Sequence, residues 1–201
     1  MADPPRPLRL VVDVNVWVAH LIAAQHRRSG TAAQAIAAIA SDMQLGRRPV
    51  QLVISLEMLD TLERVLIRLG FSAAAAGDFG SALVELMRTG PEALDPYLLL
   101  SGRDQLDIHD RKDAGVLATA IAGRADLLVT DNLADFETKD SERIQTRVVA
   151  SGGRERQLFA LVHERQDGVN LLVAHPLGVL DWIARGVEPS AAGVRTAARA
   201  P

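Results

Sequence analysis

The run Leu8 to Val12 constrains the fold more than any other part of the sequence, because it is short, mainly aliphatic and ended abruptly by Asp13. Leucine and valine in such a run are typical of a central parallel strand that is covered on both faces. A strand of this kind needs a neighbour on each side and helices above and below it. The sequence therefore predicts an α/β fold.

Further strands and helices alternate along the chain, as a parallel sheet with right-handed crossovers requires. Three more buried strands are predicted, at residues 50–54, 126–130 and 170–174. Helices are predicted over residues 31–45, 55–69, 72–88, 113–123 and 177–185. Ser55 is a good N-cap for the second helix, and Gly46 and Gly70 are expected to end the first two.

A chain of 201 residues with 48% hydrophobic content can bury one substantial hydrophobic core, but it is short for two such cores. We expect one domain over residues 8–185, between disordered segments at 1–7 and 186–201 that offer little to bury. Within it, residues 148–150 and 158–162 are predicted strands. The second is expected to turn at Asp167 and Gly168 and to pair with the strand at 170–174 as a hairpin.

The composition excludes several classes of function. The chain has no cysteine, so a disulfide framework, thiol catalysis and Cys-ligated metals are excluded, and oxygen or imidazole must hold any metal. A net charge of −3 and 3% aromatic residues predict neither a basic binding surface nor a base-stacking platform. With no apolar stretch of the roughly 18–20 residues of a membrane span and no signal peptide, we expect a cytoplasmic protein without a membrane partner.

Acidic residues follow the predicted strands or begin a predicted helix at three places. They are Asp13 with Asn15, then Asp107, Asp110 and Asp113, and then Asp131 with Asn132 and Asp135. In open α/β sheets, ligands bind outside the carboxyl ends of the strands, where such residues converge. Taken singly, Asp110 or Asp113 also suits a helix N-cap, and Asp131 with Asn132 suits a turn.

Asp13 is harder to explain by structure alone, because a carboxylate at the end of a buried strand is costly without a partner. Carboxylates gathered from separate strand ends repel one another unless a cation lies among them, and oxygen ligands suit Mg²⁺ or Mn²⁺. The combination predicts hydrolysis of a phosphodiester bond. A phosphatase-like or nucleotide-binding enzyme is a weaker alternative, since the sequence holds neither a P-loop nor a GxGxxG motif.

Four stretches resemble the PIN-domain family, and more closely its toxin-type (VapC-like) branch from toxin–antitoxin pairs. They are LRLVVDVNVWV at 8–18, SLEMLDTLERVLIRLGF at 55–71, DIHDRKDAGVLATAIAGRADLLVTDNLADF at 107–136 and LLVAHPLGVLDWI at 171–183. The third is the most specific, because an acidic residue, a small-residue helix, a strand and a VTxNxxDF ending follow in order. Residues 137–168 lie between the last two stretches and are interpreted as an insertion atypical of the family.

The resemblance implies a PIN-like three-layer α/β/α fold with a central, mostly parallel sheet. It also implies a ribonuclease that depends on Mg²⁺ or Mn²⁺, often a homodimer with an antitoxin protein as partner. The catalytic carboxylates expected from it are Asp13, Asp113 and Asp131. The same three are expected to bind the metal, with Asn132, Glu57 and Asp110 as further oxygen donors and Asn15 and Asp135 as supporting residues.

Two positions depart from the family pattern. The pattern places Glu at the position of Thr61, and Glu57, one turn earlier, lies on the same edge of the helix, whereas Glu63 lies on the opposite edge. At the fourth acidic position, many PIN nucleases have Asp where this chain has Asn132. Fewer carboxylates weaken cation binding, so a catalytically impaired module that binds RNA or a protein is the alternative to a ribonuclease.

Overall fold

The computed structural model describes residues 6–98, 111–151, 154–165, 168 and 170–199 of the chain. Within these ranges, the side chains of residues 111–113, 145–147, 149–151, 154 and 156 are not described. Among the described residues, no helix combines the length and apolarity needed to cross a bilayer.

A seven-stranded sheet runs through the molecule in the order β2-β3-β1-β4-β7-β6-β5. The parallel strands at its centre are β3 (Arg48–Leu52), β1 (Leu8–Val12), β4 (Leu127–Val129) and β7 (Leu171–Ala174). The antiparallel strands at its borders are β2 (Gln44–Leu45), β6 (Arg154–His163) and β5 (Ser141–Ser151). The aliphatic run Leu8–Val12 is thus a central strand, as predicted, with β3 and β4 on its two sides.

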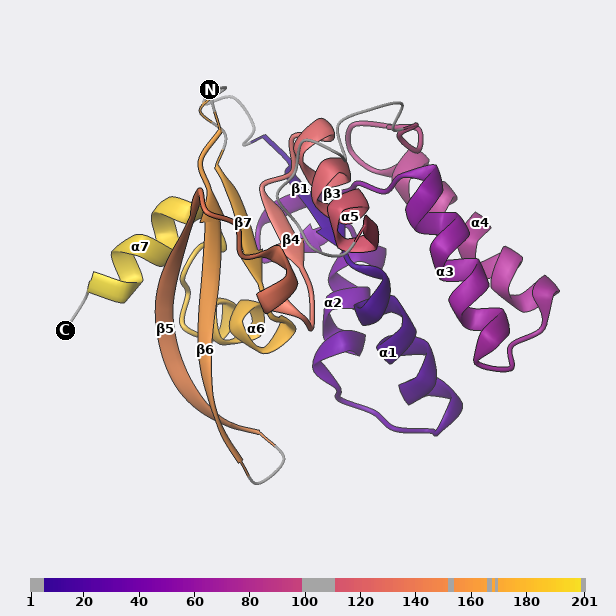
Figure 1. Cartoon of the computed structure of the whole chain (residues 1–201), viewed down its shortest axis with the longest axis horizontal. Helices are drawn as coiled ribbons and strands as arrows, with labels where there is room; N and C mark the ends of the chain where they lie inside the picture. The colour runs from indigo at the N-terminus through magenta and orange to yellow at the C-terminus, as the bar shows by residue number, and fades with distance from the viewer. Residues whose placement is uncertain (1–5, 99–110, 152–153, 166–167, 169, 200–201) are drawn as a thin grey trace.

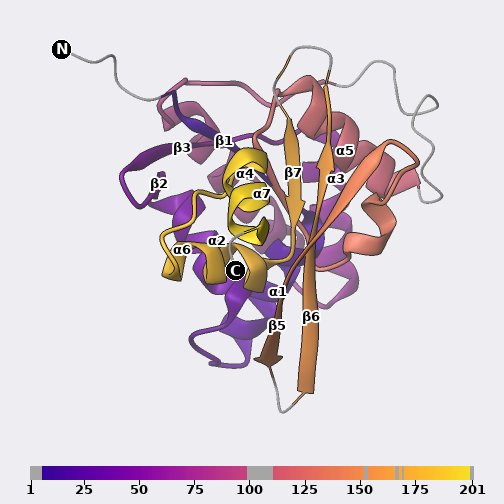
Figure 2. The same cartoon turned by 90° about the vertical axis from the view of Figure 1, so that its left-hand side faces the viewer.

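Helices cover both faces of this sheet (Figures 1 and 2). Their bounds are α1 (Val14–Gln25), α2 (Ala32–Ser41), α3 (Leu56–Arg68), α4 (Ala73–Thr89), α5 (Arg111–Ala122), α6 (Pro176–Ala184), α7 (Ala191–Arg199) and the 3-10 helix η2 (Leu133–Phe136). α2, α6 and α7 lie on one face, and α3, α4 and α5 on the other. The predicted three-layer α/β/α class with a mostly parallel sheet is confirmed.

The predicted helix over 31–45 is shorter in the structure. Thr31 caps α2 with a reciprocal capping box, but the helix ends at Ser41 and the chain then forms the antiparallel pair β2–β3. Met43 has a positive φ of 51°, and its carbonyl accepts the Val50 N–H, so the chain has already left the helix. Gly46, with φ +60°, lies in the turn between β2 and β3 and does not end the helix.

The predicted disordered tail from residue 186 onward is wrong for α7. Val194 of this helix is fully buried, and α7 packs against β5. Arg195 donates hydrogen bonds of 2.9 Å to Glu142 and 2.9 Å to Glu164, which tie the helix to the outer strands. The sequence signal is weak because only one narrow face of this short helix is apolar.

The region 137–168 contains longer strands than predicted. β5 and β6 form one antiparallel hairpin, and β6 pairs antiparallel with β7 from Ala160 to His163, as expected for the second predicted strand. The part of β6 that precedes Ala160 has no partner in β7. There the β5–β6 hairpin extends past the end of β7 as a two-stranded arm (Figure 1). Its status as an insertion relative to the family stays a prediction.

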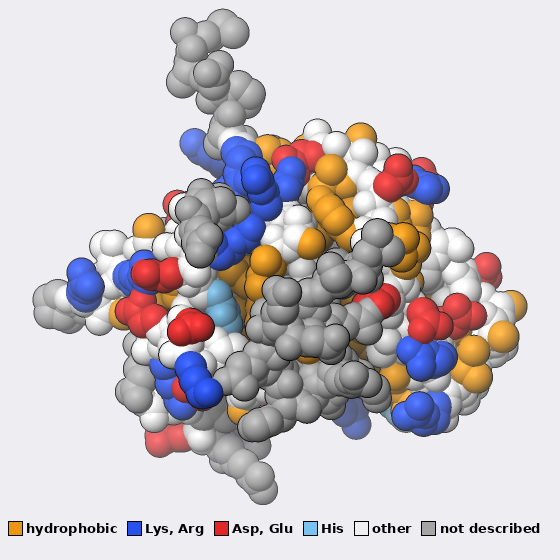
Figure 3. Space-filling model, turned by 45° about the horizontal axis from the view of Figure 1, so that its top comes forward, with side chains coloured by type: hydrophobic (Ala, Val, Ile, Leu, Met, Phe, Trp, Pro, Cys, Tyr) orange, Lys and Arg blue, Asp and Glu red, His pale blue; other side chains and the backbone are white. Residues whose placement is uncertain are grey.

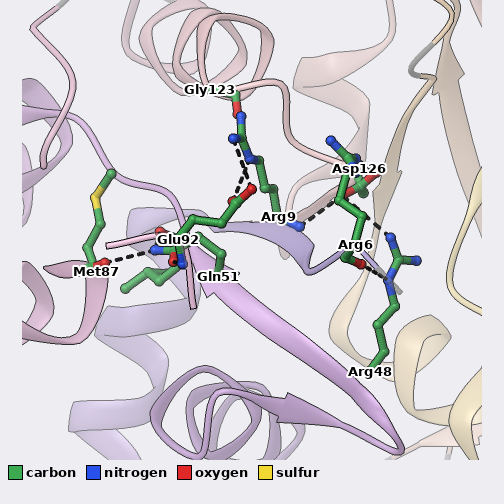
Figure 4. Close-up of polar contacts among 9 residues, drawn as sticks. Arg6, Arg9, Arg48, Gln51, Met87, Glu92, Gly123 and Asp126 are labelled. Atoms are coloured by element: carbon green, nitrogen blue, oxygen red, sulfur yellow. Dashed lines mark hydrogen bonds and ion pairs between the residues drawn. The ribbon is translucent and has the colours of Figure 1, made fainter. Parts of the chain in front are cut away.

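Ion pairs join separate segments at the amino edge of the sheet (Figure 4). Arg9 donates to Glu92 at 2.7 Å, a contact that raises the pKa of Arg9, and to the Gly123 carbonyl at 2.9 Å. Arg6 pairs with Asp126, whose other carboxylate oxygen accepts the Arg9 N–H at 2.8 Å. Figure 3, which turns this edge forward, shows Lys and Arg side chains gathered near the top of the view. Because Arg6 and Arg9 have acidic partners, they stabilise the fold.

Gln51 of β3 is a fully buried polar residue beside this network (Figure 4). Its Nε2 donates to the carbonyls of Met87 at 2.8 Å and Leu52 at 2.9 Å, and its Oε1 accepts the Glu92 N–H at 2.8 Å. The amide therefore links the central sheet to the end of α4 and the loop that follows.

We expect Gln51→Leu to lower the free energy of unfolding by about 1–3 kcal/mol, because buried backbone groups lose their partners. Urea unfolding followed by circular dichroism measures the change. Gln44→Leu on the exposed β2 is the matched control and should change stability little. Equal effects of the two substitutions would contradict a special role for the buried amide.

Candidate functional site

Three strands end side by side at the carboxyl edge of the sheet. Val12, Val129 and Ala174 are aligned in register across β1, β4 and β7. The next residue of each strand is polar: Asp13, Thr130 and His175. The Asp13 N–H donates to the Val129 carbonyl at 2.9 Å, and the Thr130 N–H to the Ala174 carbonyl at 3.0 Å, so the register continues into these residues.

Asp13 lies at the end of β1 and in the N-cap position of α1, with 3% of its surface exposed. Burial raises the pKa of this carboxyl group, and the charge of Asp131 raises it further. A hydrogen bond of 2.7 Å from Thr130 Oγ1 and the N–H groups of Val14 and Asn15 lower the pKa and partly offset the burial. An ionised Asp13 is thus poorly solvated, so a cation beside it would be strongly favourable.

The Thr130 hydroxyl group joins three residues of the site. It donates to Asp13 Oδ2 and accepts hydrogen bonds of 3.1 Å from Asn15 Nδ2 and 3.1 Å from the Asn132 N–H. Asn15 Oδ1 in turn accepts the Asp131 N–H at 3.2 Å. Asn15 is therefore linked to Asp13 through the Thr130 hydroxyl group, and its supporting role stays a prediction. Thr130 was not predicted as a site residue, although it belongs to the quoted motif.

The residues after Thr130 lie at the surface. Asp131 has a side chain that is 42% exposed and lies beside His175. Asn132 donates its side-chain amide to Asp135, which fixes the start of η2. Asp131 and Asn132 thus share an edge with Asp13, whereas Asp135 contacts Asn132, and its supporting role stays a prediction.

Glu57 lies in the first turn of α3 and faces α5. A methyl group placed on Gly115 of α5 would lie 3.8 Å from Glu57 Oε2. Glu57 is half-buried, whereas Asp60 and Glu63 of the same helix are exposed. Thr61, at the position of the family glutamate, accepts a contact of 3.4 Å from Arg64. Glu57 as the replacement for the family glutamate at position 61 stays a prediction.

A buried pair of hydroxyl groups fixes α3 against α5. Ser55 caps α3 by accepting the Met58 N–H at 3.3 Å, which confirms its predicted capping role. Thr119 of α5 donates to Ser55 Oγ at 2.9 Å, and both residues are fully buried. This contact was not predicted, because it joins two helices that are far apart in the chain.

Asp113 lies in the first turn of α5, the helix that Glu57 faces, but its side chain is not among those described. Asp107 and Asp110 lie outside the described residues. Among the described side chains, no three acidic, histidine or cysteine residues form a group that could hold a metal ion. The metal-binding and catalytic roles of Asp13, Asp113, Asp131, Asn132, Glu57 and Asp110 therefore stay predictions.

Comparison with known proteins identifies the family. The PIN domain family matches residues 9–134, which is more than half of the chain and extends from β1 to the start of η2. Searches of curated proteins and of solved structures gave no match. The match includes the strand ends and helices that position Asp13, Glu57 and Thr130. This chain belongs to the PIN-domain family.

Proposed function

We propose that the protein is a metal-dependent endoribonuclease that hydrolyses RNA phosphodiester bonds. PIN domains are generally nucleases, and the family match supports that general activity. The observation that carries the proposal is Asp13, a carboxylate that is 3% exposed at the carboxyl edge of a mostly parallel sheet. Burial raises its pKa, so the folded protein does not fully stabilise the charged form of this side chain.

The donor set fits Mg²⁺ or Mn²⁺, since it consists of carboxylate and amide oxygens. Asp13, Asp113 and Asp131 would hold the ion, with Glu57, Asp110 and Asn132 as further oxygen donors. When bound there, the ion supplies an activated water and stabilises negative charge on the scissile phosphate. Thr130 and Asn15 hold Asp13 and the backbone of Asp131 in place, so the geometry exists before substrate binds.

A second candidate function is an impaired PIN module that binds RNA or a protein without turnover. The observation that favours it is the loss of charge at two family positions, where Thr61 contacts Arg64 and Asn132 contacts Asp135. Such a module would bind RNA without cleaving it. Metal-stimulated cleavage that disappears in Asp113→Ala would rule it out.

The proposed activity is tested with purified protein and single-stranded RNA. We expect cleavage with Mn²⁺ or Mg²⁺, and none after EDTA is added. Restoration of cleavage by excess Mn²⁺ would exclude damage to the protein by the chelator. Binding of RNA with no cleavage in any divalent cation would support the impaired module.

The role of α3 is tested by a pair of isosteric changes. We expect Glu57→Gln to weaken Mn²⁺ binding about tenfold, because it removes a carboxylate that faces α5. Glu63→Gln, on the exposed side of the same helix, should leave Mn²⁺ binding unchanged. Electron paramagnetic resonance of free Mn²⁺ measures both dissociation constants. If Glu63→Gln weakens Mn²⁺ binding as much as Glu57→Gln, the result would contradict a specific role of the Glu57 carboxylate in the metal site.

We further propose the toxin role that the resemblance implies, with an antitoxin protein as partner, a homodimer and a cytoplasmic location. These proposals rest on the similarity to the toxin-type branch. The start of the domain at residue 8 likewise stays a proposal, whereas α7 extends the packed domain beyond residue 185. Size-exclusion chromatography with light scattering tests the homodimer directly.

A further inference from the structure

His175 occupies a position at the candidate site that no acidic pattern predicts. It follows β7 directly, and the carbonyl of the preceding Ala174 accepts the Thr130 N–H at 3.0 Å. His175 is also the N-cap of α6, so its backbone is fixed by both a strand and a helix. Its side chain is 15% exposed, at the edge where Asp13 and Asp131 lie.

The capping contact determines which ring nitrogen carries the proton. Nδ1 of His175 accepts the Leu177 N–H at 3.1 Å, so this nitrogen is an acceptor. In a neutral imidazole with Nδ1 as acceptor, the proton is on Nε2. Nε2 lies 3.4 Å from Asp131 Oδ1. The ring therefore presents an N–H group to the carboxylate of Asp131, at a distance slightly longer than a standard hydrogen bond.

Asp131 is held at two points as a result. Its backbone N–H donates to Asn15 Oδ1 at 3.2 Å, and its side chain faces His175. Since the Asp131 side chain is 42% exposed, solvent competes for its orientation when the imidazole is absent. The histidine restrains an exposed carboxylate and keeps it at the strand ends.

We propose that His175 is a positioning residue for the metal site, which acts by orienting the carboxylate of Asp131. The inference rests on the proposed function, because it assigns to Asp131 a part in holding the cation. Outer groups that orient a metal-binding carboxylate commonly change metal affinity by about 10- to 100-fold. The imidazole orients Asp131 and does not itself bind the cation.

The test uses a substitution that keeps the helix cap. His175→Asn retains an oxygen that can accept the Leu177 N–H, since Asn is a favoured N-cap, but it has no N–H at the position of Nε2. We expect this variant to bind Mn²⁺ about tenfold more weakly with an unchanged thermal midpoint. In the background of Asp131→Asn, the same change should have no further effect on Mn²⁺ binding.

Two results would overturn the inference. One is unchanged Mn²⁺ affinity in His175→Asn, and the other is an equal loss with and without the Asp131 carboxylate, which would indicate a purely structural role. A wild-type protein that binds no Mn²⁺ would contradict the proposed function instead. In that case ¹⁵N NMR of the imidazole decides on the contact: an Nε2–H tautomer whose signal moves in Asp131→Asn supports it, and an Nδ1–H tautomer or an unmoved signal refutes it.

Discussion

Replacing Asp13 by Asn should lower the rate of metal-dependent RNA cleavage by about 100- to 1000-fold, the largest effect that we expect at this site. The substitution keeps the size of the side chain but removes the charge that would bind the cation. It also leaves an oxygen that can accept the Thr130 hydroxyl. Single-turnover cleavage of a labelled RNA measures the loss, and an unchanged rate would show that the site is wrongly assigned.

The same substitution should make the protein more stable at neutral pH. Burial raises the folded-state pKa of Asp13 above its ordinary value of 3.8, so the folded protein holds this proton more tightly than the unfolded chain. Wild-type stability therefore falls as pH rises through the interval from 3.8 to the folded pKa, and Asp13→Asn lacks that fall. The stability difference should be absent at acidic pH, should grow across this interval and should then stay constant. Urea unfolding at several pH values measures it.

Replacing Thr130 by Val should have the second largest effect, a loss of cleavage rate of about 10- to 100-fold. Valine has the shape of threonine but cannot donate to Asp13 or accept from Asn15 and Asn132. The groups left unpaired should also lower the free energy of unfolding by about 1–3 kcal/mol. Cleavage kinetics and urea unfolding measure the two effects.

Thr130→Ser is the matched control for this experiment, because serine keeps the hydroxyl group. It should retain most of the cleavage rate and most of the stability. If Thr130→Ser loses as much activity as Thr130→Val, the methyl group and not the hydrogen bonding of the hydroxyl would be the important part of residue 130.

The parts of the fold that the sequence predicts well are those with strong local patterns. The central strand Leu8–Val12 has a short aliphatic run, and α3 has a regular apolar stripe between the cap at Ser55 and Gly70. Gly70 has φ +94°, a conformation that favours glycine after a helix. Such features depend on neighbouring residues, so a single sequence is sufficient to find them.

The parts that escaped prediction depend on contacts between distant segments. α7 is held by Arg195 through Glu142 and Glu164, which lie 53 and 31 residues before Arg195 in the chain. α1 lacks a distinct apolar stripe and was not predicted as a helix.

The same limit applies to the site. Asp13 could be predicted as a site residue from the sequence, because a carboxylate after an aliphatic run is unusual. Thr130 and His175 could not be predicted as site residues, because their place at the site depends on the alignment of β1, β4 and β7 in space. Asp113 was predicted from the motif, and its partnership with Asp13 stays a prediction.

Asp13 is the single residue between the end of β1 and the start of α1, so this junction cannot change its length without moving the helix. One added residue would turn α1 by roughly 100° about its axis, given 3.6 residues per turn. Val16 and Trp17, which are buried, would then leave the core. An insertion at this point would therefore disrupt the packing of α1 as well as the position of the Asp13 carboxylate. The length of the junction should be kept even in relatives that have lost the carboxylate.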